Sequence, residues 1–377
     1  MRDRPVSGKL AVSIFTLVLA GCGGGYDAPS DESPPVVPAT VVPRFAYMTN
    51  QASSNVTTFG IDEGTGALTV AGGDVATGTG PRSVAADPSG RFVYVANGGT
   101  GDVTTFSVDP GTGALTQVGI PAAAGAVPRS VAVDPTGHFV YAANAGDDNV
   151  TTFSVNQTTG ALTEVGSEVL AGSTPVSVAV GPTGQFAYVV NQVSEDVTTF
   201  SIDQMTGALA EVGSEVPAGS TPVSIAVDPS GRFAYVANII SNDVTTFSID
   251  QMTGVLTEVG TPVGAGTNPA AAAVETSGRF AYVANYGSGD VTTFSINQMT
   301  GALSEVGTEV PAGGSPAALA VDPSGRFLYV AITIAGNVSN VAVFSINQAT
   351  GALTPVETEA GSGAMGASSI AIVGSTS

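Results

Sequence analysis

Two arginines stand in matching sequence contexts and offer the clearest binding chemistry in the chain. Arg82 and Arg129 each follow a proline and precede a serine, and 47 residues separate them. A guanidinium carries several N–H donors in one plane, which suits the paired oxygens of a carboxylate or a phosphate. We therefore predict that Arg82 and Arg129 hold a small anionic ligand. The alternative is that the two charges only neutralise the acidic loops around them.

A series of asparagines forms a second candidate group. Each one closes a short run of the type Phe-Ala-Tyr-Val-Ala-Asn. An asparagine at such a place either bonds its own backbone in a turn or presents an amide to a ligand. Both roles stay open, and the candidates for ligand binding are Asn97, Asn144, Asn191, Asn238 and Asn285.

The rest of the composition removes several kinds of chemistry. Lys9 is the only lysine and lies near the N-terminus, so phosphate-binding loops and Schiff-base chemistry are excluded. One histidine and one cysteine cannot build a Cys/His metal site. The net charge of −21 opposes binding to nucleic acid. We predict no catalytic residue, no cofactor and no metal site, although the segment 147–149 (Asp-Asp-Asn) offers oxygen ligands of the kind that Ca²⁺ prefers.

Other charged residues follow a glycine in a repeated turn. We expect the arginines there to pair with an acidic residue of the same turn or to stack on the following strand. The arginines at this position are Arg44, Arg91, Arg232, Arg279 and Arg326, and the last four have an acidic residue in the same turn. His138 takes the same position in its repeat, and we interpret it as a surface turn residue.

The N-terminus has the pattern of an exported, anchored protein. Basic residues precede an apolar run, Leu10 to Leu19, which is too short to span a bilayer and is typical of a secretory signal. The run ends in Leu-Ala-Gly-Cys, which resembles the lipobox of bacterial lipoproteins. The resemblance implies removal of residues 1–21 and lipidation of Cys22. Residues 22–42 are rich in Gly, Pro, Ser and Asp, as expected of a flexible linker. We expect a cell-envelope protein on the periplasmic or surface face of the outer membrane, held there only by this lipid.

Seven repeats organise the remaining chain. A tyrosine every 47 residues marks them: Tyr47, Tyr94, Tyr141, Tyr188, Tyr235, Tyr282 and Tyr329. In one copy, four β-rich segments at 224–227, 233–237, 244–249 and 255–259 are separated by turn residues. Four strands per unit at this period indicate a propeller blade.

The two ends of the chain supply complementary parts of one repeat. The chain enters its first repeat at the second strand, near Phe45, and the segment 369–373 matches a first strand. We therefore predict an all-β, seven-bladed β-propeller with four antiparallel strands per blade over residues 43–377. The C-terminal strand closes the ring by joining the N-terminal blade, and we expect a monomer.

The repeat itself, Asp-Pro-Ser-Gly-Arg-Phe-x-Tyr-Val-Ala-Asn followed by Asp-Val-Thr-Thr-Phe-Ser-Ile-Asp, resembles the seven-bladed lactonases, which include 6-phosphogluconolactonases, and the YVTN-repeat propellers. The resemblance implies a lactonase-like fold. Lactonases of this type carry Pro-Arg-His at an inner strand and an acidic residue after the strand-ending asparagine. Here Ser83 and Ser130 replace the histidine, and no acidic residue follows the asparagines.

Two functions remain open on these residues. The first is a lipid-anchored binding or interaction module, whose partner is a small anionic molecule or a cell-envelope protein or glycan. The alternative is a lactonase-type hydrolase that acts on an anionic lactone held by Arg82 and Arg129. Whether the protein is an enzyme is not decided by the sequence.

Overall fold

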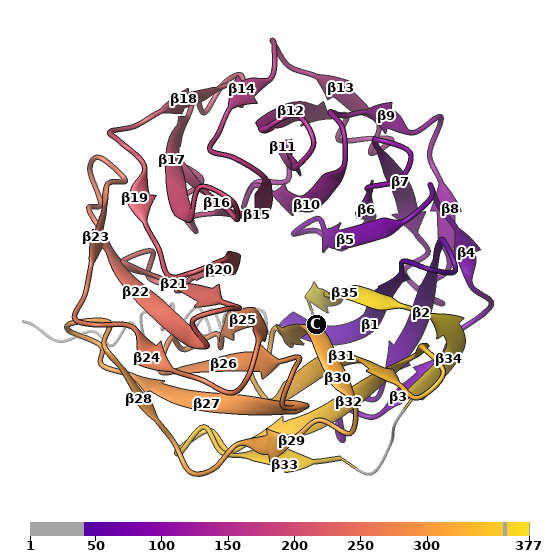
Figure 1. The fold of residues 1–377 in the computed structure, drawn as a ribbon. Helices are drawn as coiled ribbons and strands as arrows, with labels where there is room; N and C mark the ends of the chain where they lie inside the picture. The colour runs from indigo at the N-terminus through magenta and orange to yellow at the C-terminus, as the bar shows by residue number, and fades with distance from the viewer. Residues whose placement is uncertain (1–40, 357–359, 377) are drawn as a thin grey trace, which may run out of the picture. The chain divides into compact units, whose positions relative to one another are not determined.

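Seven β-sheets form a ring in the computed structural model, which describes residues 41–356 and 360–376 (Figure 1). Each sheet is one blade with four strand positions, and neighbouring strands are antiparallel. The outermost position holds two short strands that pair with different parts of the third strand. The predicted seven-bladed all-β propeller is confirmed, and the split of the outermost strand is a detail that was not predicted. No helix among the described residues has the length and apolarity needed to cross a membrane.

The first two strands of each blade lie nearest the centre of the ring (Figure 1). The innermost strands are β5 (Pro81–Ala86), β10 (Pro128–Val133), β15 (Pro175–Val180), β20 (Pro222–Val227), β25 (Pro269–Val274), β30 (Ser315–Val321) and β35 (Ala367–Thr376). The second strands are β6 (Phe92–Asn97), β11 (Phe139–Asn144), β16 (Phe186–Asn191), β21 (Phe233–Asn238), β26 (Phe280–Asn285), β31 (Phe327–Ile334) and β1 (Val41–Asn50).

The remaining strands form the outer part of each blade. The third strands are β7 (Asp102–Val108), β12 (Asn149–Val155), β17 (Asp196–Ile202), β22 (Asp243–Ile249), β27 (Asp290–Ile296), β32 (Val338–Ile346) and β2 (Asn55–Ile61). The outermost pairs are β8 (Leu115–Gln117) with β9 (Ala122–Ala123), β13 (Leu162–Glu164) with β14 (Val169–Leu170), β18 (Leu209–Glu211) with β19 (Val216–Pro217), β23 (Leu256–Glu258) with β24 (Val263–Gly264), β28 (Leu303–Glu305) with β29 (Val310–Pro311), β33 (Leu353–Pro355) with β34 (Ala360–Met365), and β3 (Leu68–Val70) with β4 (Val75–Ala76).

The ring closes where the two ends of the described chain meet. Strand β35 pairs antiparallel with β1, with Phe45 opposite Val373 and Met48 opposite Ile370. The predicted closure by the C-terminal strand is therefore confirmed. The first described strand begins at Val41, two residues before the expected boundary. The predicted signal peptide (1–21), the lipidated Cys22 and the linker up to residue 40 lie outside the described residues.

The turns between innermost and second strands form as their residue types predict. In one blade, the Asp228 carboxylate accepts the backbone N–H of Phe233 at 2.8 Å, and the N–H of Gly231 bonds to the Asp228 carbonyl at 2.8 Å. Gly231 has a positive φ of 70°, which glycine adopts without strain. These bonds fix the angle at which the second strand starts.

Four of the five arginines at the turn position stack on the following strand, which is one of the two arrangements that we expected. Arg91 lies 5.1 Å from the centre of the Phe92 ring and donates to the Gln157 carbonyl of the next blade at 2.9 Å. Three more arginines stack on the following phenylalanine in the same way, at 5.3 Å (Arg232), 5.5 Å (Arg279) and 5.2 Å (Arg326). Arg44, at the equivalent position of the blade that closes the ring, is exposed and has no such stacking among the described residues. The expected ion pairs with the turn acids are wrong for the described residues, because the turn serine, here Ser89, stands between the two charges and bonds both. His138 is exposed and contacts Thr136, in agreement with a surface turn residue.

Buried tyrosines tie neighbouring blades together. The Tyr141 hydroxyl donates to the Gly207 carbonyl of the next blade at 3.1 Å, and burial raises the pKa of this tyrosine, so it keeps its proton. Gly207 has φ of 75°, and a side chain there would come within 2.2 Å of the Phe139 ring. The same bond joins four other pairs of blades, from Tyr47, Tyr235, Tyr282 and Tyr329. The Tyr94 hydroxyl is buried but has no partner among the described residues.

This difference between two equivalent tyrosines predicts different costs for the same substitution. Tyr141→Phe removes a buried hydrogen bond and should lower the free energy of unfolding by about 1 kcal/mol. Tyr94→Phe removes a hydroxyl that has no partner, so stability should stay equal or rise. Urea unfolding of residues 23–377 measures both. Equal losses in the two variants would show that the interblade bond does not contribute.

Candidate functional site

A pocket of about 360 Å³ lies at one end of the innermost strands, and we call it the central pocket. Half of its twelve lining residues come from one equivalent position, at the start of six of the seven innermost strands. They are Arg82, Arg129, Val176, Val223, Ala317 and Ser368. Because equivalent strands repeat around the ring, residues that are 47 apart in sequence lie side by side in this wall. The two predicted arginines are thus brought together in adjacent blades, and apolar side chains occupy the next blades.

The two guanidiniums lie close enough to repel each other. Burial and, secondly, the charge of Arg82 lower the pKa of Arg129 from its usual value, although an arginine stays charged at neutral pH. The Nε atoms of Arg82 and Arg129 are buried, and neither donates a hydrogen bond to any acceptor of the described residues. No carboxylate of the described residues forms an ion pair with either guanidinium. The central pocket therefore concentrates positive charge in a chain whose net charge is −21.

A glycine makes room for one of these side chains. Gly98 follows the second strand of its blade, and a Cβ added there would lie 2.9 Å from Nε and 3.1 Å from Cδ of Arg82. The Arg82 side chain therefore lies directly across the Gly98 backbone. This contact holds the guanidinium over the pocket instead of leaving it free in solvent.

The loops add polar groups that our sequence analysis did not select. Gln51, Tyr286 and Thr333 line the central pocket from the ends of three second strands or just beyond them. Asn337 joins them from the three-residue insertion in the last repeat. A signal for these residues exists in the sequence, because the position after the strand-ending asparagine differs in almost every blade. Only the fold shows that it faces the pocket.

The predicted asparagines are not part of the pocket wall. Asn97, for example, is fully buried, and its amide donates to Asp102 at 2.6 Å and to Thr104 at 2.8 Å in the same blade. The equivalent amides make the same two kinds of bond, at Asn144, Asn191, Asn238 and Asn285. These bonds hold the second and third strands at the correct separation. We therefore leave the asparagines out of the proposed site.

The serines at the position of the lactonase histidine also have structural partners. The Ser83 hydroxyl accepts the backbone N–H of Val131 in the next blade at 3.2 Å. Ser130 accepts the N–H of Val178 in the same way at 3.1 Å. Each bond satisfies a backbone N–H of an innermost strand in the next blade. The two hydroxyls therefore have a structural role.

The acidic residues considered for Ca²⁺ are engaged by backbone groups. Asp147 accepts the N–H of Ala126 at 2.5 Å, and Asp148 accepts that of Thr174 at 2.6 Å. Within residues 41–356 and 360–376, no cluster of three or more His, Cys, Asp or Glu side chains has the geometry of a metal site. The two carboxylates order the loops that lead into innermost strands.

Comparison with known proteins agrees with this architecture. A family model described as "Lactonase, 7-bladed beta-propeller" matches residues 37–126, 83–180, 172–268 and 260–367. A Bacteroides uniformis protein, provisionally assigned as a 6-phosphogluconolactonase, is 21% identical with a TM-score of 0.77, over 88% of this chain and 99% of that one. A periplasmic gluconolactonase of Pseudomonas aeruginosa is 22% identical with a TM-score of 0.72, over 87% and 98%. At these identities the likeness concerns the fold alone. No curated protein matches the sequence.

Two equivalent asparagines differ in whether their side-chain oxygen accepts a hydrogen bond. Thr77 donates to the Asn97 side-chain oxygen at 3.0 Å, whereas the equivalent residue before Asn191 is Ala171, and the Asn191 oxygen is buried without a partner among the described residues. Ala171→Thr should therefore supply the missing bond and raise the free energy of unfolding by about 1 kcal/mol.

Ala171→Val is the matched control, because it has the same size and no hydroxyl. Urea unfolding should show a gain for the threonine variant over the valine variant. If the two variants are equally stable, then the Asn191 oxygen is satisfied in solution and the interpretation is wrong.

Proposed function

Because the chain belongs to the seven-bladed lactonase β-propeller family, we propose that it binds a small anionic molecule in the central pocket through Arg82 and Arg129. The fold of this family does not by itself fix an activity, so the proposal depends on the site. One observation carries it: two adjacent, half-buried guanidiniums have no carboxylate partner among the described residues. Such a pair is unfavourable alone and is relieved by an anion that accepts hydrogen bonds from both.

The composition of the pocket wall supports binding more than hydrolysis. Opening a lactone needs a general base for water or an acid for the ring oxygen. No His, Asp or Glu is among the residues that line the central pocket in the described part of the chain. The hydroxyls of Ser83 and Ser130 are already engaged with the next blade. The wall therefore offers anion recognition and no evident proton acceptor.

The place of action is part of the proposal. The signal-like N-terminus and Leu-Ala-Gly-Cys support a lipid anchor on Cys22, with the propeller held outside the cytoplasm by the linker. A cell-envelope protein or glycan is a second kind of partner for such an exposed ring. The acidic net charge of −21 favours neither nucleic acid nor an anionic membrane surface.

A lactonase-type hydrolase is the second candidate. Family membership and the likeness to the periplasmic gluconolactonase of Pseudomonas aeruginosa favour it. In this case Arg82 and Arg129 would orient an anionic lactone, and the base would have to come from outside the pocket wall. The two candidates share the anion site and differ in turnover.

The anion site is tested by calorimetric titration of residues 23–377 with gluconate and 6-phosphogluconate. In the Arg82→Ala/Arg129→Ala variant, affinity should fall by at least about tenfold, because each charge-assisted hydrogen bond contributes about 1.5–3 kcal/mol. Arg232→Ala/Arg279→Ala is the control, since it removes the same charge from turns that do not line the pocket. Absence of binding, or equal affinity in both double variants, would remove the proposed site.

Turnover separates the two candidates. Acid release in a pH-stat with a panel of lactones, including 6-phosphogluconolactone, should not exceed the spontaneous rate if the protein only binds. Turnover that is lost in the Arg82→Ala/Arg129→Ala variant and kept in the control would instead establish the hydrolase.

A further inference from the structure

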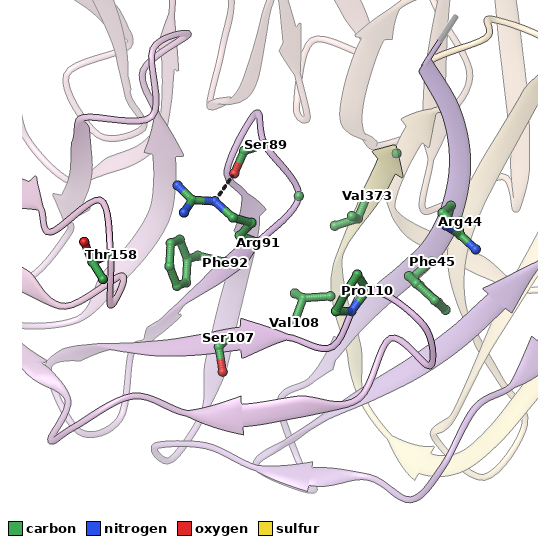
Figure 2. A pocket seen from close by; sticks show the side chains of 12 residues that line it. Arg44, Phe45, Ser89, Arg91, Phe92, Ser107, Val108, Pro110, Thr158 and Val373 are labelled. Atoms are coloured by element: carbon green, nitrogen blue, oxygen red, sulfur yellow. Dashed lines mark hydrogen bonds between the residues drawn. The ribbon is translucent and has the colours of Figure 1, made fainter. Parts of the chain in front are cut away.

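A second pocket, of about 350 Å³, lies at the opposite end of the strands, where the ring closes (Figure 2). We call it the seam pocket. Figure 2 shows Arg91 and Phe92 on one side and Arg44 and Phe45 on the other. Val108, Pro110 and Val373 lie between these two sides. The seam pocket shares no lining residue with the central pocket, so it is independent of the function proposed above.

The first cause of this pocket is a turn that the ring closure leaves out. In the other six blades, a five-residue connection joins the innermost strand to the second strand, as residues 87–91 do. In the blade that closes the ring, β35 and β1 come from opposite ends of the chain. A Cβ on Gly137 would lie 3.4 Å from Pro88 of the preceding turn. Gly90 has no such turn beside it and packs instead on Val373 and Gly374.

The second cause of the seam pocket is Pro110, which stands where five other blades have a glutamine. Five blades have a glutamine after the third strand, and its amide donates to the carbonyl of the turn glycine at 2.6–2.8 Å. These glutamines are Gln157, Gln204, Gln251, Gln298 and Gln348. The cavity beside Gln251 measures only about 10 Å³. The equivalent residue at the seam is Pro110, which has no amide to donate and leaves the space open.

Both departures leave polar groups in the seam pocket without partners. The Gly90 carbonyl accepts no hydrogen bond from the described residues, although its equivalents each accept one from a glutamine. Arg44 is exposed and, within the described part of the chain, has neither the stacking nor the hydrogen bonds of the other turn arginines. Phe45, Phe92 and Val108 supply apolar walls. The pocket thus combines an acceptor, an apolar interior and a cation at the rim.

We propose that the seam pocket binds a small, flat apolar molecule that carries an N–H or O–H donor on its ring and a carboxylate at its other end. The donor takes the place of the glutamine amide at the Gly90 carbonyl, the ring lies between Phe45 and Phe92, and the carboxylate meets Arg44. The volume falls in the range of small-molecule sites. The five glutamine-filled blades show what the site accepts, because their own side chains occupy it.

Indole-3-acetate is a suitable probe, because it has a ring N–H and a carboxylate and the chain contains no tryptophan. Its fluorescence anisotropy with residues 23–377, which include the whole propeller, should show saturable binding. In Pro110→Gln, the new side chain should bond to Gly90 as Gln251 bonds to Gly231, and affinity should fall by at least about tenfold. The variant should unfold at the same or a higher urea concentration, since five blades already carry this glutamine.

Further variants and probes identify the contacts. Arg44→Gln should weaken binding of indole-3-acetate and leave that of neutral indole-3-acetamide unchanged. 1-Naphthylacetate, which lacks the N–H, should bind more weakly than indole-3-acetate. Arg82→Ala/Arg129→Ala should have no effect, and a loss of binding in that variant would place the probe in the central pocket and overturn the proposal. Equal affinity in wild type and Pro110→Gln, or no binding up to the solubility of the probe, would also overturn it.

Discussion

The ladder between β1 and β35 is the constraint on which the rest of the structure depends. It joins the first and last described strands, and both are ten residues long where the equivalent strands of most blades have six. The extra length replaces a covalent turn with more strand pairing. Once the ring is closed, every innermost strand has a neighbour on both sides, and no blade face is left exposed. The tyrosine bonds between blades and the serine bonds at the centre can then repeat around the ring.

A closed ring of nearly identical blades makes single departures from the repeat informative. Arg82 and Arg129 depart at the central end of the innermost strands, and Pro110 departs at the opposite end. Neither change alters the strand pairing of its blade, because each lies at a strand end or in a turn. The scaffold therefore tolerates them at low cost, and each creates a local property that the other blades lack. The two pockets are separate consequences of the same uniform frame.

The sequence predicted the fold well because its information is local and repeated. Turn residues such as Asp228 and Gly231 mark the strand ends, and the period of 47 residues gives the number of blades. The convergence of Arg82 and Arg129 was also predictable, since equal positions in adjacent blades must be neighbours. The split outermost strand was missed because pieces such as Val263–Gly264 have two residues and no periodic pattern. The expected turn ion pairs failed because a serine hydroxyl solvates the acid at shorter range than the arginine reaches.

The seam pocket was beyond sequence reasoning for a different physical reason. It results from a side chain that does not fill a space, and that space exists only after the ring has closed. Pro110 in isolation is an ordinary turn residue. Its effect is recognised only by comparison with Gln251, whose amide bonds to the Gly231 carbonyl twenty residues earlier in the chain.

The central pocket differs from the seam pocket because it contains added charge. Two neighbouring positive charges lie there without an acidic partner among the described residues, which is unfavourable for stability. Burial and the nearby charge of Arg82 lower the pKa of Arg129, and neither guanidinium gains a compensating carboxylate from the described residues. The chain has 31 acidic side chains, so a partner was available in composition but not at this position. Valine and alanine hold the same place in other blades without loss of the fold. The cost of the arginine pair is therefore not required by the architecture, and the anion that we propose to bind in the pocket would offset it.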